Sequence, residues 1–82
     1  MKNPTIHVVI KDKTRTYFEG DIFAISSYNE KGLFDILPFH ENFISLIKDK
    51  IILHDNGMQK EMKIDNGLLK INGNKVNIYL GA

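Results

Sequence analysis

Residues 32–40 read Gly32-Leu33-Phe34-Asp35-Ile36-Leu37-Pro38-Phe39-His40. The stretch predicts a short strand over residues 33–37, entered at a glycine and stopped by a proline, which cannot donate a ladder hydrogen bond. The histidine after the proline is predicted to lie exposed on the turn that follows. Because a strand that ends at a rigid corner displays the loop beyond it, this stretch is our first candidate for a functional surface.

Outward from this stretch, turn residues punctuate the chain at short intervals. Its six glycines mostly stand near Asn, Asp or Glu, and the runs between them are rich in Ile, Val, Phe and Tyr. Such spacing is typical of β-sandwiches and barrels, and no stretch combines helical apolar periodicity with helix caps. We therefore predict an all-β fold, a two-sheet β-sandwich of about eight to ten short, mainly antiparallel strands.

Turn chemistry predicts two hairpins and a corner. Asp55-Asn56-Gly57 is a strong hairpin signal, since Asn-Gly accepts the positive φ values of a primed turn, and Asn72-Gly73-Asn74 marks a second hairpin. Glu19-Gly20-Asp21 is interpreted as a corner, and Lys48-Asp49-Lys50 as the end of a strand. Besides residues 33–37, strands are predicted over residues 5–10, from 16–18 onward, and over 22–27, 43–47, 51–54, 58–64, 68–71 and 76–80.

Length and composition limit the classes of protein to which this chain can belong. Eighty-two residues make one domain, residues 1–82, because a chain of this size has a single core. With 43% hydrophobic and 26% charged residues the chain is ordinary globular material. Its longest apolar runs are too short to span a bilayer, so no direct membrane insertion is predicted. A net charge of +1 with scattered lysines argues against nucleic acid as a partner.

Candidate residues for chemistry are few. The chain has no cysteine, which excludes a thiolate metal site, and no pair of glycines has phosphate-loop spacing, so no cofactor is predicted. His7 and His54 lack the spacing of zinc or iron ligands and are interpreted as structural. His40 with Glu41 is better placed, on a loop, but no nucleophile or oxyanion site accompanies the pair. The other polar candidates are interpreted as structural: Ser26, Ser27 and Ser45 as cross-strand hydrogen bonders, and Glu19 and Asp21 as caps of the turn at Gly20.

The large apolar side chains are predicted to divide between core and surface. Most of the five Phe and three Tyr side chains are predicted to lie in the core, since aromatics supply the largest buried area in so small a domain. Leu33 and Phe39 stand beside a turn glycine and a turn proline, and together they predict a contact surface. The residues alone thus indicate a binding or structural module rather than an enzyme. Ile6, Val8 and Ile10 are predicted to share one face of their strand, and the aliphatic residues predicted to point inward are Leu69, Ile71, Val76, Ile78 and Leu80.

Three motifs in order resemble the amino-terminal β-sandwich domain of the epsilon subunit of F-type ATP synthase, from about Ile6 to Leu80. The aromatic-x-Gly corner of that family is matched by Phe18-Glu19-Gly20. Its Gly-x-x-Gly-Ile-Leu-Pro-Gly-His-Ala-Pro-Leu signature is matched at Gly32, Ile36, Leu37, Pro38, His40 and Ile44. Its closing pattern of Gly-Gly-aliphatic-Leu-x-Val, a turn, then Val-x-Val is matched at Gly67, Leu68, Leu69, Ile71, Val76 and Ile78.

Several positions depart from the family motifs. Asp35 and Phe39 stand where the signature has glycines, and Leu33 stands where an acidic residue associated with contact to the rotor ring is usual. The family normally continues into a two-helix arm that binds ATP in some members and obstructs rotation in the hydrolysis direction. This sequence stops at Ala82, so we expect that C-terminal helical domain to be absent. The other departures are Glu41 and Asn42 for Ala-Pro, Asp49 and Lys50 for Pro-Gly, and Asn66 for the first paired glycine.

The resemblance implies a non-catalytic central-stalk (rotor) subunit that joins the gamma subunit to the membrane c-ring during proton-driven ATP synthesis. It implies a peripheral location at the cytoplasmic face of the bacterial inner membrane. The alternative is a free-standing β-sandwich that binds a protein or a ligand, since fold does not fix function. An enzyme ranks third and would need a pocket lined by His40, Glu41 and a third polar group. The predicted contacts to the polar loops of the c-ring are Glu30, Lys31, Gly32, Leu33, Phe34, Pro38, Phe39 and His40, and those to the gamma subunit are Glu41, Asn42, Phe43, Ile44, Asp65 and Asn66.

Overall fold

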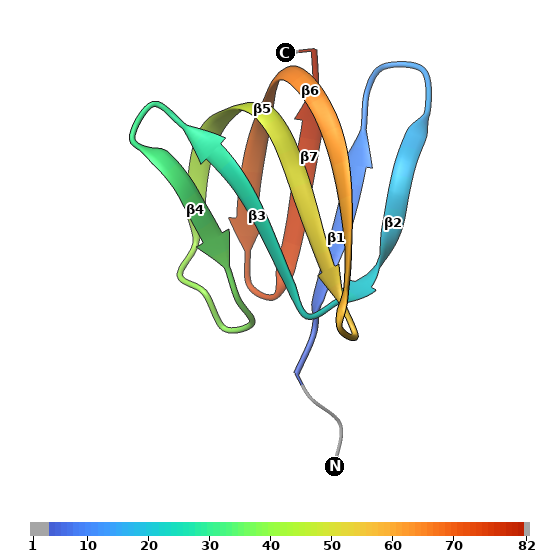
Figure 1. Ribbon diagram of the computed structural model, residues 1–82, viewed down its shortest axis with the longest axis vertical. Coiled ribbons are helices and arrows are strands. Elements are labelled where there is room, and N and C mark those ends of the chain that lie inside the picture. The colour runs from blue at the N-terminus through green and yellow to red at the C-terminus, as the bar shows by residue number, and fades with distance from the viewer. Residues whose placement is uncertain (1–3, 82) are drawn as a thin grey trace.

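The computed structural model describes residues 4–81. These residues form seven strands in one hydrogen-bonded sheet and no helix, so the predicted all-β class is confirmed (Figure 1). The sheet order is β2-β1-β7-β6-β5-β3-β4, and every neighbouring pair is antiparallel except β1 with β7. The ends of the predicted domain 1–82 lie outside the described residues. The strands are β1 (Ile6–Lys11), β2 (Thr16–Ile22), β3 (Ala24–Asn29), β4 (Gly32–Ile36), β5 (Phe43–Asp55), β6 (Met58–Asn72) and β7 (Lys75–Leu80).

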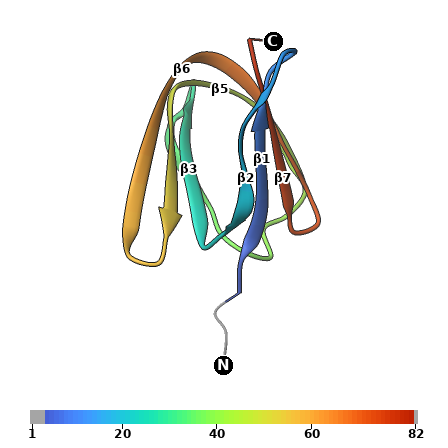
Figure 2. The ribbon, with the colours of Figure 1, turned by 90° about the vertical axis from the view of Figure 1, so that its right-hand side faces the viewer.

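Two long strands fold this single sheet into a sandwich. β5 and β6 are 13 and 15 residues long, and both arch from one layer into the other (Figure 2). The first half of β5 pairs only with β6, whereas its second half lies between β6 and β3. The register shifts between Lys48 and Asp49, and Asp49 has a φ of 71°, so a β-bulge marks the bend.

The bend divides the strands between two layers. The five-strand layer contains β2, β1, β7, residues 66–72 of β6 and residues 43–48 of β5. The four-strand layer contains β4, β3, residues 49–55 of β5 and residues 58–64 of β6. Because side chains alternate along a strand, each layer has one inner face toward the other layer and one outer face.

The structure has fewer strands than predicted because the bends do not break the strands. The predicted strands 43–47 and 51–54 are both parts of β5, and 58–64 and 68–71 are both parts of β6. Lys48-Asp49-Lys50 is therefore a bulge within β5 and not its end. A bulge leaves one residue unpaired while the ladder continues on either side, so a polar run of this kind does not mark a terminus.

The predicted corner at Glu19-Gly20-Asp21 is wrong. All three residues lie inside β2, where Gly20 is opposite Val8 of β1. Gly20 has no positive φ, and a Cβ built on it would lie 3.5 Å from Cζ of Phe18. That distance is an ordinary contact, so Gly20 is an extended strand residue with space for a side chain and does not turn the chain. The chain turns at Phe23 instead, between β2 and β3.

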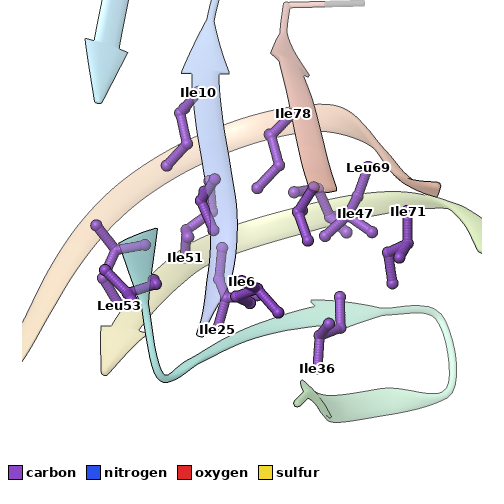
Figure 3. Packing of buried hydrophobic residues seen from close by; sticks show 13 residues of the cluster. Ile6, Ile10, Ile25, Ile36, Ile47, Ile51, Leu53, Leu69, Ile71 and Ile78 are labelled. Atoms are coloured by element: carbon purple, nitrogen blue, oxygen red, sulfur yellow. The ribbon is translucent and has the colours of Figure 1, made fainter. Parts of the chain in front are cut away.

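The core between the layers is aliphatic. It consists of thirteen buried Ile, Val and Leu side chains, and each of the seven strands contributes at least one (Figure 3). The predicted inward residues are buried except Leu80, which is half-buried, and the face that Ile6, Val8 and Ile10 share is the buried one. The cluster contains Ile6, Val8, Ile10, Ile22, Ile25, Ile36, Ile47, Ile51, Leu53, Leu69, Ile71, Val76 and Ile78.

The prediction that most aromatic side chains lie in the core is wrong. Among the described residues, no Phe or Tyr side chain is fully buried. Phe18, Phe34 and Phe43 pack against the margin of the core, and Phe39 is exposed. Layers about 10 Å apart are filled by branched aliphatic side chains from both inner faces, so the larger rings lie where the layers open toward solvent.

Candidate docking surface

Two free strand edges lie on the same side of the molecule (Figure 1). β4 pairs with β3 alone, and residues 43–47 of β5 pair with β6 alone. An open groove of about 740 Å³ lies between these two edges. Within it the rings of Phe34 and Phe43 meet edge to face, with centroids 5.8 Å apart. The predicted contact residues that line this groove are Glu30, Lys31, Gly32, Leu33, Phe34, His40, Phe43 and Ile44.

Residues 37–42, here called the anchored loop, join β4 to β5 and are tied to the turn between β6 and β7. The backbone N–H of Phe39 donates to Oδ1 of Asn74 at 3.3 Å. The backbone N–H of Gly73 donates to Oδ1 of Asn42 at 2.9 Å. Between these ties Phe39 is 81% exposed. The loop therefore holds an apolar ring in solvent on a fixed backbone. Leu37, predicted to end the strand, belongs to this loop because β4 ends at Ile36.

Phe39 occupies a backbone conformation that suits glycine, the residue the family signature has at this position. Its φ is 66°, which costs a non-glycine residue about 1–2 kcal/mol. Since the exposed ring has little packing to lose, we expect Phe39→Gly to raise the free energy of unfolding by about 0.5–1 kcal/mol, after the added entropy of the unfolded chain is counted. Urea denaturation measures this change. Leu37→Gly is the control, since Leu37 has no positive φ, and it should destabilise; a loss of stability in both variants would contradict the prediction.

The structure does not bring all the predicted contacts to one place. Glu30 and Lys31 lie at the turn between β3 and β4, at the opposite end of β4 from the anchored loop (Figure 1). Residues 41–44 enter β5 at one end of the five-strand layer, whereas Asp65 and Asn66 lie at the bend of β6. The predicted gamma contacts are thus divided between two ends of that layer.

Leu46 lies on the surface, although the apolar run over residues 43–47 suggests a buried strand. It is 72% exposed, and Ile44 on the same face is 63% exposed. A strand that is apolar on both faces usually lies inside a sandwich. This half of β5 is instead an edge with one apolar face turned outward. No local signal in the sequence distinguishes the two cases, because the absence of a second partner strand is a property of the whole fold.

Ser26, Asp35 and His54 lie together across β4, β3 and β5 but do not form a catalytic triad. Ser26 Oγ donates to Asp35 Oδ1 at 2.5 Å and lies 2.8 Å from His54 Nε2. In a serine hydrolase the acid orients the histidine, which then activates the serine. Here the acid and the histidine both contact the serine, which is only 3% exposed. The cross-strand hydrogen-bonding role predicted for Ser26 is therefore confirmed.

His40 and Glu41 do not form an acid–base pair across their side chains. The ring Nδ1 of His40 donates to the backbone carbonyl of Glu41 at 2.9 Å. His40 lines the groove, whereas Glu41 is not among the residues that line it. Within residues 4–81, no three His, Cys, Asp or Glu side chains converge as metal ligands would. The same residues contain no helix long and apolar enough to cross a bilayer. What the site presents is a contact surface of free edges and an exposed ring.

His7 lies between two carboxylates of β2 on the outer face of the five-strand layer. Its Nδ1 is 2.9 Å from Oδ1 of Asp21, and its Nε2 is 3.2 Å from Oε2 of Glu19. The prediction that Glu19 and Asp21 cap a turn is therefore wrong, because both side chains bind His7. The hydrogen bond to Asp21, followed by the one to Glu19, raises the pKa of His7 above its ordinary value of 6.5.

We expect the NMR titration of the His7 ring to have its midpoint above pH 6.5, and Asp21→Asn to move that midpoint back toward 6.5. Because the folded pKa exceeds the unfolded one, protonated His7 stabilises the fold fully below pH 6.5, and this contribution is lost as the pH rises through the raised pKa. Asp55→Asn, in the turn between β5 and β6, is the control. A His7 midpoint that Asp21→Asn leaves in place would show that the carboxylate is not the cause.

Comparison with known proteins places this geometry in a family. The family model described as the ATP synthase, Delta/Epsilon chain, beta-sandwich domain matches residues 5–81. An ATP synthase epsilon chain of Campylobacter fetus subsp. fetus (strain 82-40) is 32% identical over 74 residues, which are 88% of this chain. The chain spans 57% of the length of that relative.

Solved structures share the fold at low sequence identity. A chain of the Euglena gracilis mitochondrial ATP synthase, in an OSCP/F1/c-ring assembly, superimposes with a TM-score of 0.87 at 16% identity, over 95% of this chain and 51% of its own. A chain of the Tetrahymena thermophila mitochondrial ATP synthase central stalk and c-ring superimposes with a TM-score of 0.80 at 10% identity, over 98% of this chain and 66% of its own. The family match covers nearly every described residue, and the sandwich agrees with it; the chain therefore belongs to the β-sandwich domain family of ATP synthase delta/epsilon chains.

Proposed function

We propose that this domain is a non-catalytic part of the central stalk of an F-type ATP synthase, where it couples the gamma subunit to the c-ring during proton-driven ATP synthesis. The observation that carries the proposal is the family match over residues 5–81. A curated relative named as an ATP synthase epsilon chain supports it, as do fold matches within assemblies that contain a c-ring. In that place the domain is a peripheral component at the cytoplasmic face of a bacterial inner membrane.

A part that transmits torque has to resist deformation, and three features of this domain do so. All seven strands belong to one hydrogen-bonded sheet, and β5 and β6 each run through both layers. The core is close-packed from every strand, and close-packed interiors have low compressibility. The anchored loop is tied to the turn between β6 and β7 at two points. Force applied at that loop passes directly into the sheet.

The anchored loop and the groove edge beside it form the ring surface in this proposal. Phe39 is its apolar anchor, since exposed aromatic rings at the centre of an interface commonly contribute most of the binding energy. The ring contacts are Glu30, Lys31, Gly32, Leu33, Phe34, Pro38, Phe39 and His40. The gamma contacts are Glu41, Asn42, Phe43, Ile44, Asp65 and Asn66.

Binding to purified gamma subunit from the same source tests the central-stalk role. Interfaces of standard size bind in the nanomolar to micromolar range, so we expect a dissociation constant below about 1 μM by isothermal titration calorimetry. Absence of detectable association at micromolar concentrations would overturn the proposal.

The ring surface has a separate test. The complex of gamma with Phe39→Asp should bind purified c-ring at least about 30-fold more weakly than the complex with the unchanged domain, while its affinity for gamma stays the same. Lys13→Gln, in the turn between β1 and β2, changes the net charge by the same amount at the opposite end of the molecule and serves as the control (Figure 1). If Phe39→Asp leaves ring binding intact, the ring surface lies elsewhere on the domain.

A further inference from the structure

β4 is an edge strand of the four-strand layer. It pairs with β3 on one side and with no other strand among residues 4–81 (Figure 1). Half of the backbone N–H and C=O groups of an edge strand point away from its neighbour, which makes the edge a template for another strand. Leu33, the second residue of β4, is 59% exposed. The edge therefore offers both backbone hydrogen-bonding groups and an apolar side chain to a partner.

Two side chains of opposite charge flank Leu33 along this edge. Lys31 precedes it by two residues, in the turn from β3, and Asp35 follows it by two. Both are exposed, and none of the ion pairs within residues 4–81 includes either of them. Ser26 donates a hydrogen bond to Oδ1 of Asp35, which leaves the charge of the carboxylate in place. The sequence Lys-Gly-Leu-Phe-Asp over residues 31–35 is therefore complementary in charge to its own reverse.

Two copies of this edge, paired antiparallel and centred on Leu33, satisfy that complementarity. A two-fold axis through the two Leu33 residues places Lys31 of each copy opposite Asp35 of the other. Opposite charges across a strand pair stabilise it, and the two leucines then meet between the two charge pairs. A register centred on Phe34 instead places Asp35 opposite Leu33 and matches neither charge. A shift by one residue turns the side chains of the second copy to the other face.

We propose that a second copy of this domain pairs with the β4 edge, in an antiparallel, two-fold symmetric dimer whose register is centred on Leu33. The pairing joins the four-strand layers of the two copies into one continuous sheet. β4 has only five residues, so the interface is small and the dimer belongs to the weak, transient class. The inference does not rest on the central-stalk function, because it involves only this chain.

The other free edges of the described fold suit self-pairing less well. β2 and residues 58–64 of β6 carry carboxylates that already form ion pairs within the chain, to His7 and Lys50 respectively. Residues 43–47 of β5 contain no charged side chain, so no charge pair there selects one register over another. Among the edges that the structure describes, β4 combines unpaired charges of both signs with an exposed leucine between them.

Self-pairing and binding to the c-ring exclude each other if the ring surface is the one proposed above, because that surface includes Leu33. A copy that is paired through β4 cannot offer this side chain to the ring. Self-pairing then covers an exposed strand edge while the domain is outside the assembly, and binding to the ring replaces it.

Sedimentation velocity of the purified domain over a concentration series tests the inference. We expect the unchanged domain to shift from monomer toward dimer with a dissociation constant on the order of 10–100 μM, as suits a small interface. Lys31→Asp places two acids opposite each other, and Asp35→Lys places two lysines opposite each other, so either change should weaken self-association at least about tenfold. An equimolar mixture of these two variants should dimerise as the unchanged domain does, because each copy again faces the opposite charge.

The controls change the charge equally at positions away from β4. Lys13→Asp, in the turn between β1 and β2, is the control for Lys31→Asp and should leave self-association unchanged. Leu33→Asp should abolish the dimer, whereas Met58→Asp, at another exposed apolar position, should not. Thermal melts establish that each variant is folded before association is measured. Lys31→Asp and Leu33→Asp keep the test decisive if Asp35→Lys unfolds the domain.

The outcomes separate this inference from the central-stalk proposal. A monomer at every concentration up to about 1 mM, or a dimer that Lys31→Asp and Leu33→Asp leave intact, would overturn the inference. A mixture of the two charge variants that stays monomeric would overturn the register. Amide NMR signals of residues 32–36 should shift with concentration, and shifts confined to β2 would assign the contact to that edge instead. None of these measurements uses gamma or the c-ring, so a failure here leaves the central-stalk role standing.

Discussion

Gly67→Val is expected to lower the free energy of unfolding by about 3 kcal/mol, because added side-chain atoms at this point of β6 meet backbone. A Cβ on Gly67 would lie 3.1 Å from the carbonyl oxygen of Tyr79 and 3.3 Å from Cδ2 of Leu80. On the other side it would lie 3.4 Å from Cγ1 of Ile47. Valine adds two further methyl groups to this space. The Tyr79 carbonyl cannot retreat without disturbing the pairing of β6 with β7.

Urea denaturation of Gly67→Val and Gly67→Ala measures this cost, and the alanine variant should lose about 1–2 kcal/mol. Gly20→Ala is the matched control, another glycine inside a strand without a positive φ. Its added Cβ meets only the ring of Phe18, at the ordinary contact distance of 3.5 Å. That variant should stay within about 0.5 kcal/mol of the parent. Equal losses at the two positions would mean that crowding at Gly67 is not the cause.

Ile78→Ala is expected to destabilise the domain by about 2–5 kcal/mol, the range for deleting a buried isoleucine side chain. Ile78 is 0% exposed on β7, which lies between β1 and β6 near the middle of the five-strand layer. Because β1 and β6 flank β7, the core can collapse only partly into the cavity that the shortened side chain would leave. A domain of this size shifts its melting temperature by about 4–8 °C per kcal/mol, so the melting midpoint should fall by at least about 8 °C.

Differential scanning calorimetry measures that shift. Ile78→Val removes a single methylene and should cost about 0.5–1.5 kcal/mol, which places it between the parent and the alanine variant. Met58→Ala removes an apolar side chain of similar size from an exposed position at the start of β6 and should change the melting temperature little. A melting temperature for Ile78→Ala equal to that of Met58→Ala would refute the packed core described above.

The hairpin turn between β5 and β6 could be predicted from the sequence because a turn depends on a short stretch of chain. Asn56 and Gly57 both take positive φ values between β5 and β6, as the Asn-Gly pair predicts. The alternation of apolar residues could be predicted for the same reason: Ile6, Val8 and Ile10 share the buried face of β1, and Val76 and Ile78 of β7 are buried. The all-β class and the family resemblance follow from these local signals.

The ends of the strands and the burial of the aromatic side chains could not be predicted from such local signals. Lys48-Asp49-Lys50 resembles a terminus, but β3 beyond it and β6 beside it keep β5 in the ladder. Gly20 resembles a turn residue, but it lies inside β2, where it is paired with Val8 of β1. Both predictions were wrong because polar residues also occur at bulges and glycine also occurs inside strands.

The residues alone establish a small all-β domain of the ATP synthase delta/epsilon β-sandwich family, with an apolar corner after Pro38 and no pattern typical of a reaction site. The three-dimensional fold decides which apolar surfaces remain in solvent. It places the first half of β5 at an edge, aligns Leu46 with Leu68 and Tyr79, and ties the anchored loop to Asn74. The reason is that each of these features depends on strand pairing between segments distant in sequence, whereas turns and alternation depend on near neighbours.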